Sequence, residues 1–176
     1  MNRYIVIIAV FVLLVAMLGV GLTRDPGELE STYIDKQAPG FDLPSLANPM
    51  ARVNNASMAG GPALVNVWGT WCPGCRDEHP FLMQLEAANV LPIFGINWRD
   101  DRAAALAWLE QYGDPYVDSG FDADGRVGID WGVYGAPETF LVSAEGIVLH
   151  RYAGPLNPVV WEQEFMPLLQ AEDAKQ

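Results

Sequence analysis

The stretch WGTWCPGCRDEHP, residues 68–80, holds Cys72 and Cys75, the only two cysteines of this 176-residue chain. Two thiols at this spacing can form a structural disulfide, half of a metal site or a reactive pair. A disulfide that closes so short a loop removes little entropy from the unfolded chain, roughly 2 kcal/mol against ~3 kcal/mol for a loop of fifteen residues. The pair is therefore a poor candidate for a structural crosslink.

The residues for a metal or haem site are also few. Two thiolates supply half of a tetrahedral zinc site, and the chain has no second C-x-x-C. His79 follows Cys75 by four residues, and His150 lies far along the chain. Covalent haem attachment needs C-x-x-C-H, whereas Arg76 follows the second cysteine here. We therefore expect no bound metal and no other cofactor.

The sequence on either side of the cysteines predicts a buried strand followed by a helix. ALVNVWG, residues 63–69, is the near-continuous apolar run of a strand covered on both faces. Apolar residues at helical spacing predict a helix from about residue 73 to 88. Cys72 then lies at the helix N-terminus, where unpaired N–H groups and the helix dipole stabilise a thiolate. Cys72 is the predicted nucleophile, and Cys75, one turn further and expected to be more buried, is the predicted resolving thiol.

Strands and helices alternate along the rest of the chain. The predicted elements are a short edge strand at 41–46, a strand at 91–97, helices at 102–113 and 126–133, a hairpin at 138–152 and an amphipathic helix at 157–170. This order implies an α/β fold with a mixed sheet and helices on both faces. Pro80 should kink the first helix, and a cis bond before Pro137 would form a tight turn ahead of a strand.

Residues 4–22, at the N-terminus, contain no charge over nineteen positions. As a helix this run would be roughly 28 Å long, the thickness of a bilayer's hydrocarbon core. The alternative is a cleaved signal peptide, but its apolar region is usually ~7–15 residues long, and no A-x-A-like site or lipobox cysteine follows. We favour a retained transmembrane anchor. A short tail before it and a long domain after it suggest that the domain lies in the bacterial periplasm or an equivalent space, where thiol pairs can persist oxidised.

Four segments follow from these patterns. We expect an anchor at 1–22, a periplasmic linker at 23–40, one globular domain at 41–170 and a tail at 171–176. The chain is 51% hydrophobic with six tryptophans, which is enough for a core. Its net charge of −12 argues against binding to nucleic acid and against a polybasic lipid-binding face.

Three motifs carry a resemblance to a known family. WGTWCPGCRDEHP (68–80), GINWRDD (95–101) and GVYGAPETFLV (132–142), together with the apolar N-terminus, resemble the membrane-anchored DsbE/CcmG proteins. These are thioredoxin-like thiol:disulfide reductases of cytochrome c maturation. The resemblance covers roughly residues 41 to 169.

The resemblance implies a thioredoxin-like mixed sheet, with Cys72–Cys75 as the redox-active disulfide and Pro137 as the cis-proline beside it. Residues 95–113 correspond to an insert in the thioredoxin core. The family often carries Pro-Thr between its cysteines, whereas this chain has Pro-Gly, so the redox potential stays open. The oligomeric state stays open as well.

The resemblance also implies partners and a location. Such proteins are kept reduced by a membrane electron donor of the DsbD or CcdA type. They pass electrons to the oxidised C-x-x-C-H of apocytochrome c, directly or through a CcmH-type thiol protein, so that haem can be attached. The chain would then be a single-pass protein of the cell inner membrane with its catalytic domain facing the periplasm.

Acidic residues near the cysteines form a further hypothesis. Ordinary thioredoxins carry a buried Asp six residues before the first cysteine, and this chain has Asn66 there. Glu78, one helical turn beyond Cys75, and Glu138, directly after the proline of GAPET, could instead raise the pKa values of the thiols and act as acid or base. The alternative for Glu78 is a solvated helix face. For Glu138 the resemblance favours a functional role.

The remaining residues of the motif receive simpler interpretations. Trp68 is expected to pack in the core, and Trp71 to shield the thiol from solvent. Arg76, Asp77 and His79 are expected at the surface.

Three other functions compete with a reductase of cytochrome c biogenesis. A general periplasmic disulfide oxidase or isomerase would use the same cysteines. The oxidase would take electrons from its substrate, and the isomerase would rearrange disulfides without net electron transfer. A Cu(I) metallochaperone would bind copper with Cys72, Cys75 and His150, since soft thiolates suit Cu(I). A redox-inert docking module is disfavoured by two intact cysteines. The apolar N-terminus and the GAPET motif favour the reductase.

Overall fold

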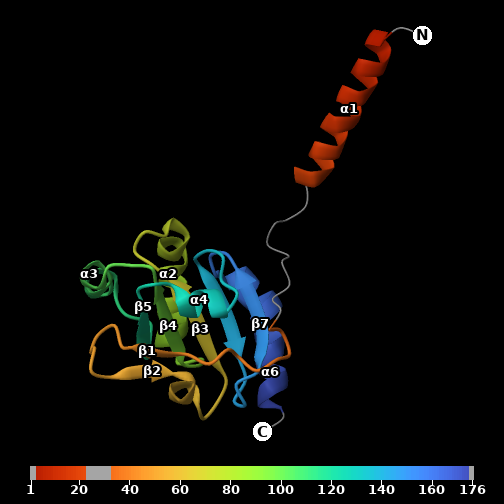
Figure 1. Cartoon of the computed structure of the whole chain (residues 1–176). Coiled ribbons are helices and arrows are strands. Elements are labelled where there is room, and N and C mark those ends of the chain that lie inside the picture. The colour runs from red at the N-terminus through yellow and green to blue at the C-terminus, as the bar shows by residue number, and fades with distance from the viewer. Residues whose placement is uncertain (1–2, 23–32, 175–176) are drawn as a thin grey trace. The chain divides into compact units, whose positions relative to one another are not determined.

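The computed structural model of the chain describes residues 3–22 and 33–174. The chain divides into two compact units, Met1–Glu30 and Ser31–Gln176, which are coloured along the chain in Figure 1. Most of the predicted linker, residues 23–32, lies outside the described residues, as do residues 175–176 of the predicted tail.

The first unit contains one helix, α1 (Arg3–Leu22), among its described residues. Its large apolar side chains between Tyr4 and Leu18 are more than half exposed. Within residues 3–22 and 33–174, no helix combines the length and the apolar character needed to cross a membrane. This finding does not support the transmembrane helix predicted for residues 4–22.

The second unit is built on a five-stranded mixed sheet in the order β5-β4-β3-β6-β7. Its strands are β3 (Ala63–Trp68), β4 (Ile93–Trp98), β5 (Asp118–Asp122), β6 (Glu138–Val142) and β7 (Val148–Ala153). β3, β4 and β5 run parallel, and β6 and β7 pair antiparallel to β3 and to each other. Every residue of β3 and β4 is buried, because helices or loops cover both faces of these central strands.

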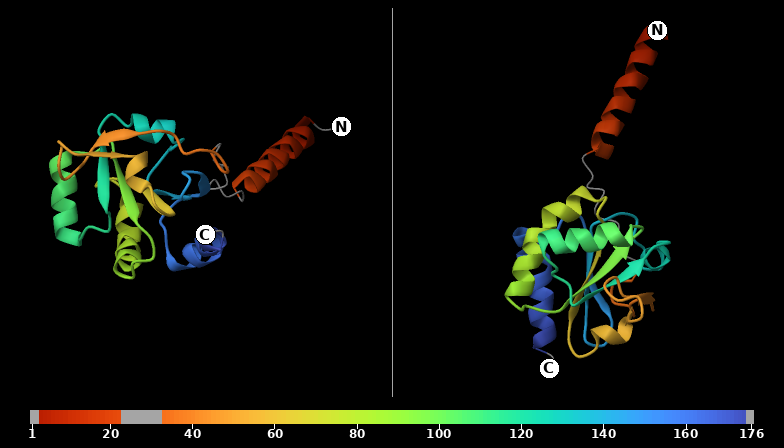
Figure 2. Two further views of the ribbon diagram at one scale, coloured as in Figure 1. Left: turned by 90° about the horizontal axis from the view of Figure 1, so that it is seen from below. Right: turned by 90° about the vertical axis from the view of Figure 1, so that its left-hand side faces the viewer.

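Two hydrophobic cores lie on opposite faces of the sheet, as the prediction of helices on both faces requires. The helices are α2 (Pro73–Ala87), α3 (Arg102–Tyr112), α4 (Arg126–Asp130), α5 (Pro158–Val160), the π-helical η2 (Trp161–Phe165) and α6 (Met166–Asp173). One core joins the sheet to α2, α3 and the C-terminal helices. The other joins it to α4 and to residues of the segment 33–58 (Figure 2).

The C-terminal helix differs from the prediction in its regularity. It begins at Pro158 with Asn157 as its N-cap, close to the predicted start at 157. A π-helical turn over Trp161–Phe165 then interrupts it. Pro167 lacks an N–H group and cannot donate to the carbonyl four residues earlier, which favours such a local rearrangement.

The segment from 33 to 58 covers both outer strands of the sheet. Asp35 N donates to Val148 O at 2.9 Å, and Val148 N donates to Lys36 O at 2.9 Å, which caps the β7 edge. β1 (Asp42–Pro44) and β2 (Arg52–Asn54) form a separate two-stranded sheet, and η1 (Asn55–Met58) follows. The strand predicted at 41–46 therefore pairs mainly with β2, and it reaches β5 only through the bridge between Ser45 and Gly120.

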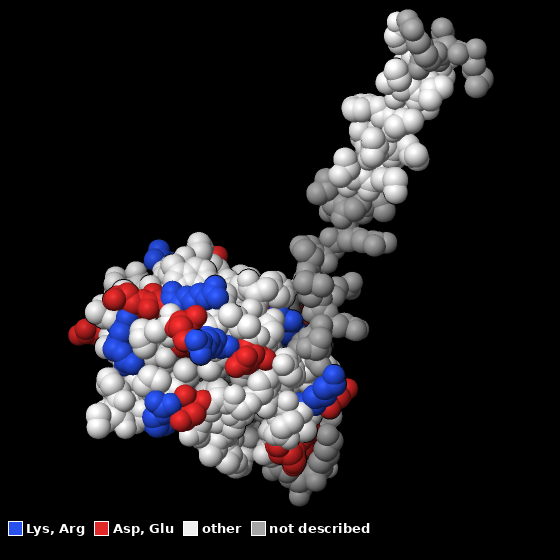
Figure 3. Space-filling view, in the orientation of Figure 1, with Lys and Arg blue, Asp and Glu red and all other residues white. Residues whose placement is uncertain are grey.

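The surface of the second unit carries both signs of charge. Figure 3 shows acidic and basic side chains intermixed on one face, without a basic patch among the coloured atoms there. A net charge as far from zero as −12 also favours solubility.

Gly95 in β4 lies very close to Ser119 of β5 and to Trp68, so a larger residue at this position would test how tightly the core is packed. A Cβ at this position would overlap the Ser119 hydroxyl of β5 and would lie 2.8 Å from the Trp68 indole nitrogen. We expect Gly95→Ala to lower the free energy of unfolding by about 1–3 kcal/mol, because the core would be overpacked. Urea denaturation measures this loss. Gly40→Ala is the control, since a Cβ there meets nothing within 4 Å. Equal stability of the two variants would contradict the packing argument.

Candidate active site

Cys72 and Cys75 form a disulfide at the start of α2, with their Cα atoms 5.3 Å apart. Cys72 is the N-cap residue of the helix, and Cys75 N donates to Cys72 Sγ at 3.0 Å. This is the predicted position, where helix N–H groups stabilise a thiolate. Cys75 was expected to be the more buried of the two, but each is 3% exposed. The reason is that the first turn of α2 is itself covered by the chain around Pro137 and Pro155.

Gly74, between the cysteines, shows how closely these segments meet. A Cβ on Gly74 would lie 2.9 Å from Pro137 Cδ and 3.1 Å from Pro155 Cγ. The Ala136–Pro137 peptide bond is cis, as the family resemblance implied. The structure therefore brings Pro137 against the cysteine-bearing turn, and its role in the reaction stays a prediction.

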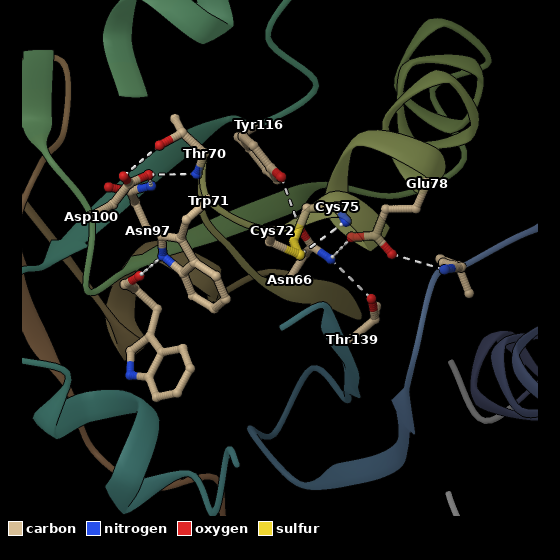
Figure 4. Close-up of a disulfide and its surroundings, with 12 residues drawn as sticks. Asn66, Thr70, Trp71, Cys72, Cys75, Glu78, Asn97, Asp100, Tyr116 and Thr139 are labelled. Carbon is tan, nitrogen blue, oxygen red and sulfur yellow. Dashed lines mark hydrogen bonds between the residues drawn. A yellow bond between two sulfur atoms is a disulfide. The ribbon is translucent and has the colours of Figure 1, made fainter. Parts of the chain in front are cut away.

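Glu78 is buried below the cysteines, with only 1% of its surface exposed. The alternative of a solvated helix face is therefore wrong for this residue. Asn66 Nδ2 donates to Glu78 Oε1 at 2.8 Å (Figure 4). Leu156 N donates to Glu78 Oε2, also at 2.8 Å. Glu78 lies three residues after Cys75 on one helix, a spacing that makes the two side chains neighbours.

Thr139 and Tyr116 complete this buried network, and neither of them was identified from the sequence. Asn66 Nδ2 also donates to Thr139 Oγ1 at 3.0 Å, and the Tyr116 hydroxyl donates to Asn66 Oδ1 at 2.8 Å. A polar residue inside the apolar run of β3 was a signal for such a network, because buried polar groups need partners. Nothing in the sequence around Tyr116 indicated that it would be a hydrogen-bond partner of Asn66.

The burial of Glu78 has a direct electrostatic consequence. Burial raises the pKa of Glu78 to about 8, and the hydrogen bonds from Leu156 N–H and Asn66 oppose this shift. A carboxyl group with such a pKa gains and loses its proton near neutral pH, which suits a general acid or base. It could accept the proton of the Cys75 thiol when that thiol becomes a nucleophile.

Glu138 is equally buried but has different surroundings. Its Oε2 forms an ion pair with Arg151 at 2.7 Å, and its Oε1 accepts from Tyr134 N at 3.1 Å and Gly135 N at 3.3 Å. Burial raises the pKa of Glu138, while the Tyr134 N–H and Arg151 oppose the shift. Adjacent strand residues point to opposite faces, so Glu138 and Thr139 face opposite sides of β6. The two candidate acids therefore belong to separate networks.

The GINWRDD motif holds the loop that precedes the cysteines. Asp100 accepts hydrogen bonds from Thr70 N at 2.7 Å, from the Thr70 hydroxyl at 2.6 Å and from Asn97 Nδ2 at 2.9 Å. Trp71 Nε1 donates to Trp98 O at 3.1 Å. These bonds fix the approach of the chain to Cys72.

The two tryptophans of the motif differ in exposure. Trp68 is 1% exposed and packs in the core, as predicted. Trp71 is 48% exposed, and its ring contacts that of Trp98 at 5.9 Å between centroids. Shielding of the thiol by Trp71 stays a prediction.

His79 was predicted at the surface, and this is wrong. It is 5% exposed, because α3 covers this side of α2 and the imidazole packs edge-on against Trp108 at 4.3 Å. Burial lowers the pKa of His79. Arg76 and Asp77 are exposed, as expected.

The copper site of the competing hypothesis is not assembled. His150 Nε2 lies 2.9 Å from Glu164 Oε2. Among residues 3–22 and 33–174, no group of three His, Cys, Asp or Glu side chains is arranged to hold a metal ion.

Comparisons with known proteins agree with this geometry. The Redoxin family matches residues 34–164. The thiol:disulfide interchange protein DsbE of Allochromatium vinosum is 46% identical over 168 residues, which cover 96% of this chain and 93% of that protein. DsbE of Escherichia coli K12 is 51% identical over 146 residues, or 82% of this chain and 78% of that protein. Among solved structures, a secreted Mycobacterium tuberculosis disulfide oxidoreductase homologous to E. coli DsbE is 27% identical, with a TM-score of 0.61 over 74% of this chain and 95% of that chain.

The raised pKa of Glu78 predicts how stability changes with pH. A carboxyl whose pKa is higher in the folded than in the unfolded state stabilises the fold fully below its unfolded pKa of about 4.5, and this stabilisation is lost as the pH rises through about 8. Relative to Glu78→Gln, we expect the oxidised wild type to lose of the order of 5 kcal/mol across this window. Denaturant unfolding at a series of pH values measures it.

The matched control is Glu86→Gln, which changes an exposed carboxyl on the same helix. Its unfolding free energy should follow that of the wild type at every pH. A constant difference between wild type and Glu78→Gln across the window would show that Glu78 titrates normally, against the prediction.

Proposed function

The chain belongs to the DsbE/CcmG-type thiol:disulfide interchange proteins, and from this premise we propose that it reduces the cysteine pair of apocytochrome c so that haem can be attached. The coarser predictions, a thioredoxin-like fold and thiol:disulfide oxidoreductase activity, are confirmed. The observation that carries the proposal is the Cys72–Cys75 disulfide at the N-terminus of α2, in a chain about half identical to DsbE proteins.

The exchange requires two attacks by sulfur. The Cys72 thiolate attacks one sulfur of the substrate disulfide, that disulfide breaks, and the other substrate sulfur leaves as a thiolate. Cys75 then transfers its proton to Glu78 and attacks Cys72 Sγ. The mixed disulfide breaks, the second substrate thiolate leaves and takes up a proton, and two electrons have passed to the substrate. The protein ends as the Cys72–Cys75 disulfide.

The two electrons that pass to the substrate in each exchange must be replaced by a reducing partner. Each turnover oxidises the cysteine pair, so a dithiol donor must return two electrons before the next one. A membrane protein of the DsbD or CcdA type is the proposed donor. Apocytochrome c, or a CcmH-type thiol protein that acts before it, is the proposed acceptor.

The proposed place of action is the periplasmic side of the cell inner membrane. Its support lies in the sequence, where residues 4–22 carry no charge, and in the exposed apolar side chains of α1. Attachment through these residues would raise the concentration of the catalytic domain near a membrane-bound assembly machine. Within residues 3–22 and 33–174, no helix has the length and apolarity of a membrane span, and membrane fractionation tests the attachment directly.

The reductase activity can be tested with an oxidised peptide that carries C-x-x-C-H. We expect the reduced wild type to convert it to the dithiol, Cys72→Ser to be inactive, and Cys75→Ser to stop at the mixed disulfide, because the resolving attack is missing. Mass spectrometry follows all three species. The proposal fails if the peptide stays oxidised while a small disulfide is reduced.

The reduction potential separates the proposal from the oxidase alternative. We expect a value nearer the thioredoxin range of about −270 mV than the DsbA value of about −120 mV. Equilibration in defined thiol buffers, followed by tryptophan fluorescence, gives the value because Trp71 directly precedes Cys72. A potential near the oxidising end would reverse the proposed direction of electron flow.

Membrane attachment can be tested by expressing the full chain and residues 23–176 in bacteria. The full chain should remain in the membrane fraction after an alkaline carbonate wash, and the shorter chain should be released, because only the first contains the uncharged run. Release of the full chain by the wash would exclude the anchor.

A further inference from the structure

Tyr116 is held beside the active site by contacts that do not involve the cysteines. Its ring stacks on Trp68, with centroids 5.5 Å apart and planes inclined by 17°, and its backbone N donates to Asp114 Oδ1 at 3.0 Å. The residue is 8% exposed. Within the described part of the chain, the hydroxyl has Asn66 Oδ1 as its one hydrogen-bond partner, at 2.8 Å. This contact fixes where the hydroxyl proton points.

The hydrogen bonds of Asn66 define which way its amide is turned. Its Oδ1 accepts from Tyr116, and its Nδ2 gives hydrogen bonds to Glu78 Oε1 and Thr139 Oγ1. If the amide turned over, Oδ1 would face the Glu78 carboxylate, and the buried Tyr116 hydroxyl would have no acceptor. Both changes are costly at a buried site, since an unsatisfied buried polar group loses its full solvation.

We propose that Tyr116 is a positioning residue for thiol:disulfide exchange, because its hydroxyl holds the Asn66 amide in the orientation that donates to Glu78 and so keeps that carboxyl ready to accept the Cys75 proton. The inference rests on the role that the proposed exchange gives to Glu78. It also places a residue of the segment between α3 and β5 in the reaction, although that segment carries no cysteine.

The electrostatics around Glu78 make this contribution measurable. Among the described residues, Tyr116 interacts electrostatically with Glu78, and Cys75 precedes Glu78 by three residues on α2. The two groups that donate hydrogen bonds to Glu78, the Asn66 amide and Leu156 N–H, are neutral. No ion pair reaches Glu78 in the described residues. Burial and the nearby charge of Glu78 raise the pKa of Tyr116 well above 10, so its hydroxyl keeps its proton and remains a donor. Burial raises the pKa of Glu78, and the groups that oppose this shift are neutral hydrogen-bond donors, Leu156 N–H and the Asn66 amide.

The test replaces the hydroxyl alone, in the full-length chain with Tyr116→Phe. This variant keeps the ring stack on Trp68, so the fold should be retained. We expect the Glu78 carboxyl, followed by carbon NMR, to titrate about half to one pH unit higher than in the wild type, because its donor is no longer held in place. The pH profile for reduction of oxidised glutathione should move in the same direction. In a Glu78→Gln background, Tyr116→Phe should leave that profile unchanged.

The matched control is Tyr112→Phe, which removes a hydroxyl from a half-exposed ring of the same region. It should leave the Glu78 titration where it is in the wild type. A second readout is the NMR signal of the Asn66 side-chain amide, whose two hydrogens should lose their protection from exchange in Tyr116→Phe only. An unchanged Glu78 titration in Tyr116→Phe, or an equal shift in Tyr112→Phe, would overturn the inference.

The outcome does not depend on the proposed substrate. If apocytochrome c is not the acceptor, the C-x-x-C-H peptide stays oxidised, while the Glu78 titration still shifts in Tyr116→Phe. If Tyr116 has no positioning role, the peptide is reduced normally and the titration of Glu78 is the same in both proteins.

Discussion

The hydrogen bond from the Asn66 amide to the Glu78 carboxyl joins the centre of the sheet to the helix that carries the cysteines. Both groups are buried, and a carboxyl in such a place is tolerated only when its oxygens have donors. Those donors come from β3 and from Leu156, whose N–H group binds the second oxygen. The hydrogen bonds that Glu78 accepts thus help to set the position of α2 on the sheet, and with it the positions of Cys72 and Cys75.

A second set of contacts holds the cysteines from the opposite direction. Asp100 binds the backbone and hydroxyl of Thr70, and the chain around Pro137 closes over Gly74. Three motifs that lie far apart in the sequence therefore meet at one turn of helix. This arrangement limits how far the disulfide-bearing turn can move. It leaves Trp71 as the more exposed of the two tryptophans beside it.

Sequence patterns predicted the elements that are buried and apolar, because a strand covered on both faces leaves a continuous apolar run and an amphipathic helix leaves a helical period. β5 was missed because DSGFD has no such pattern, and its position next to β4 depends on tertiary contacts. The burial of Glu78 and His79 could not be predicted either, since α3 and the chain at Leu156 approach them from distant parts of the sequence. The position of Cys72 at the start of a helix was predicted from the strand and helix patterns on either side of it, and the redox-active disulfide was implied by the family resemblance.

The two buried acids show why burial alone does not assign a role. Burial raises the pKa of both, but Glu138 is paired with Arg151, which favours its charged form and ties it to the turn before β6. No cation faces Glu78 among the described residues, and its donors are neutral. A carboxyl held by neutral donors can change its charge at modest cost, whereas one in a buried ion pair leaves an unpaired cation when it is protonated. Proton transfer with the thiols therefore suits Glu78, and Glu138 is better suited to holding the Pro137 turn in place.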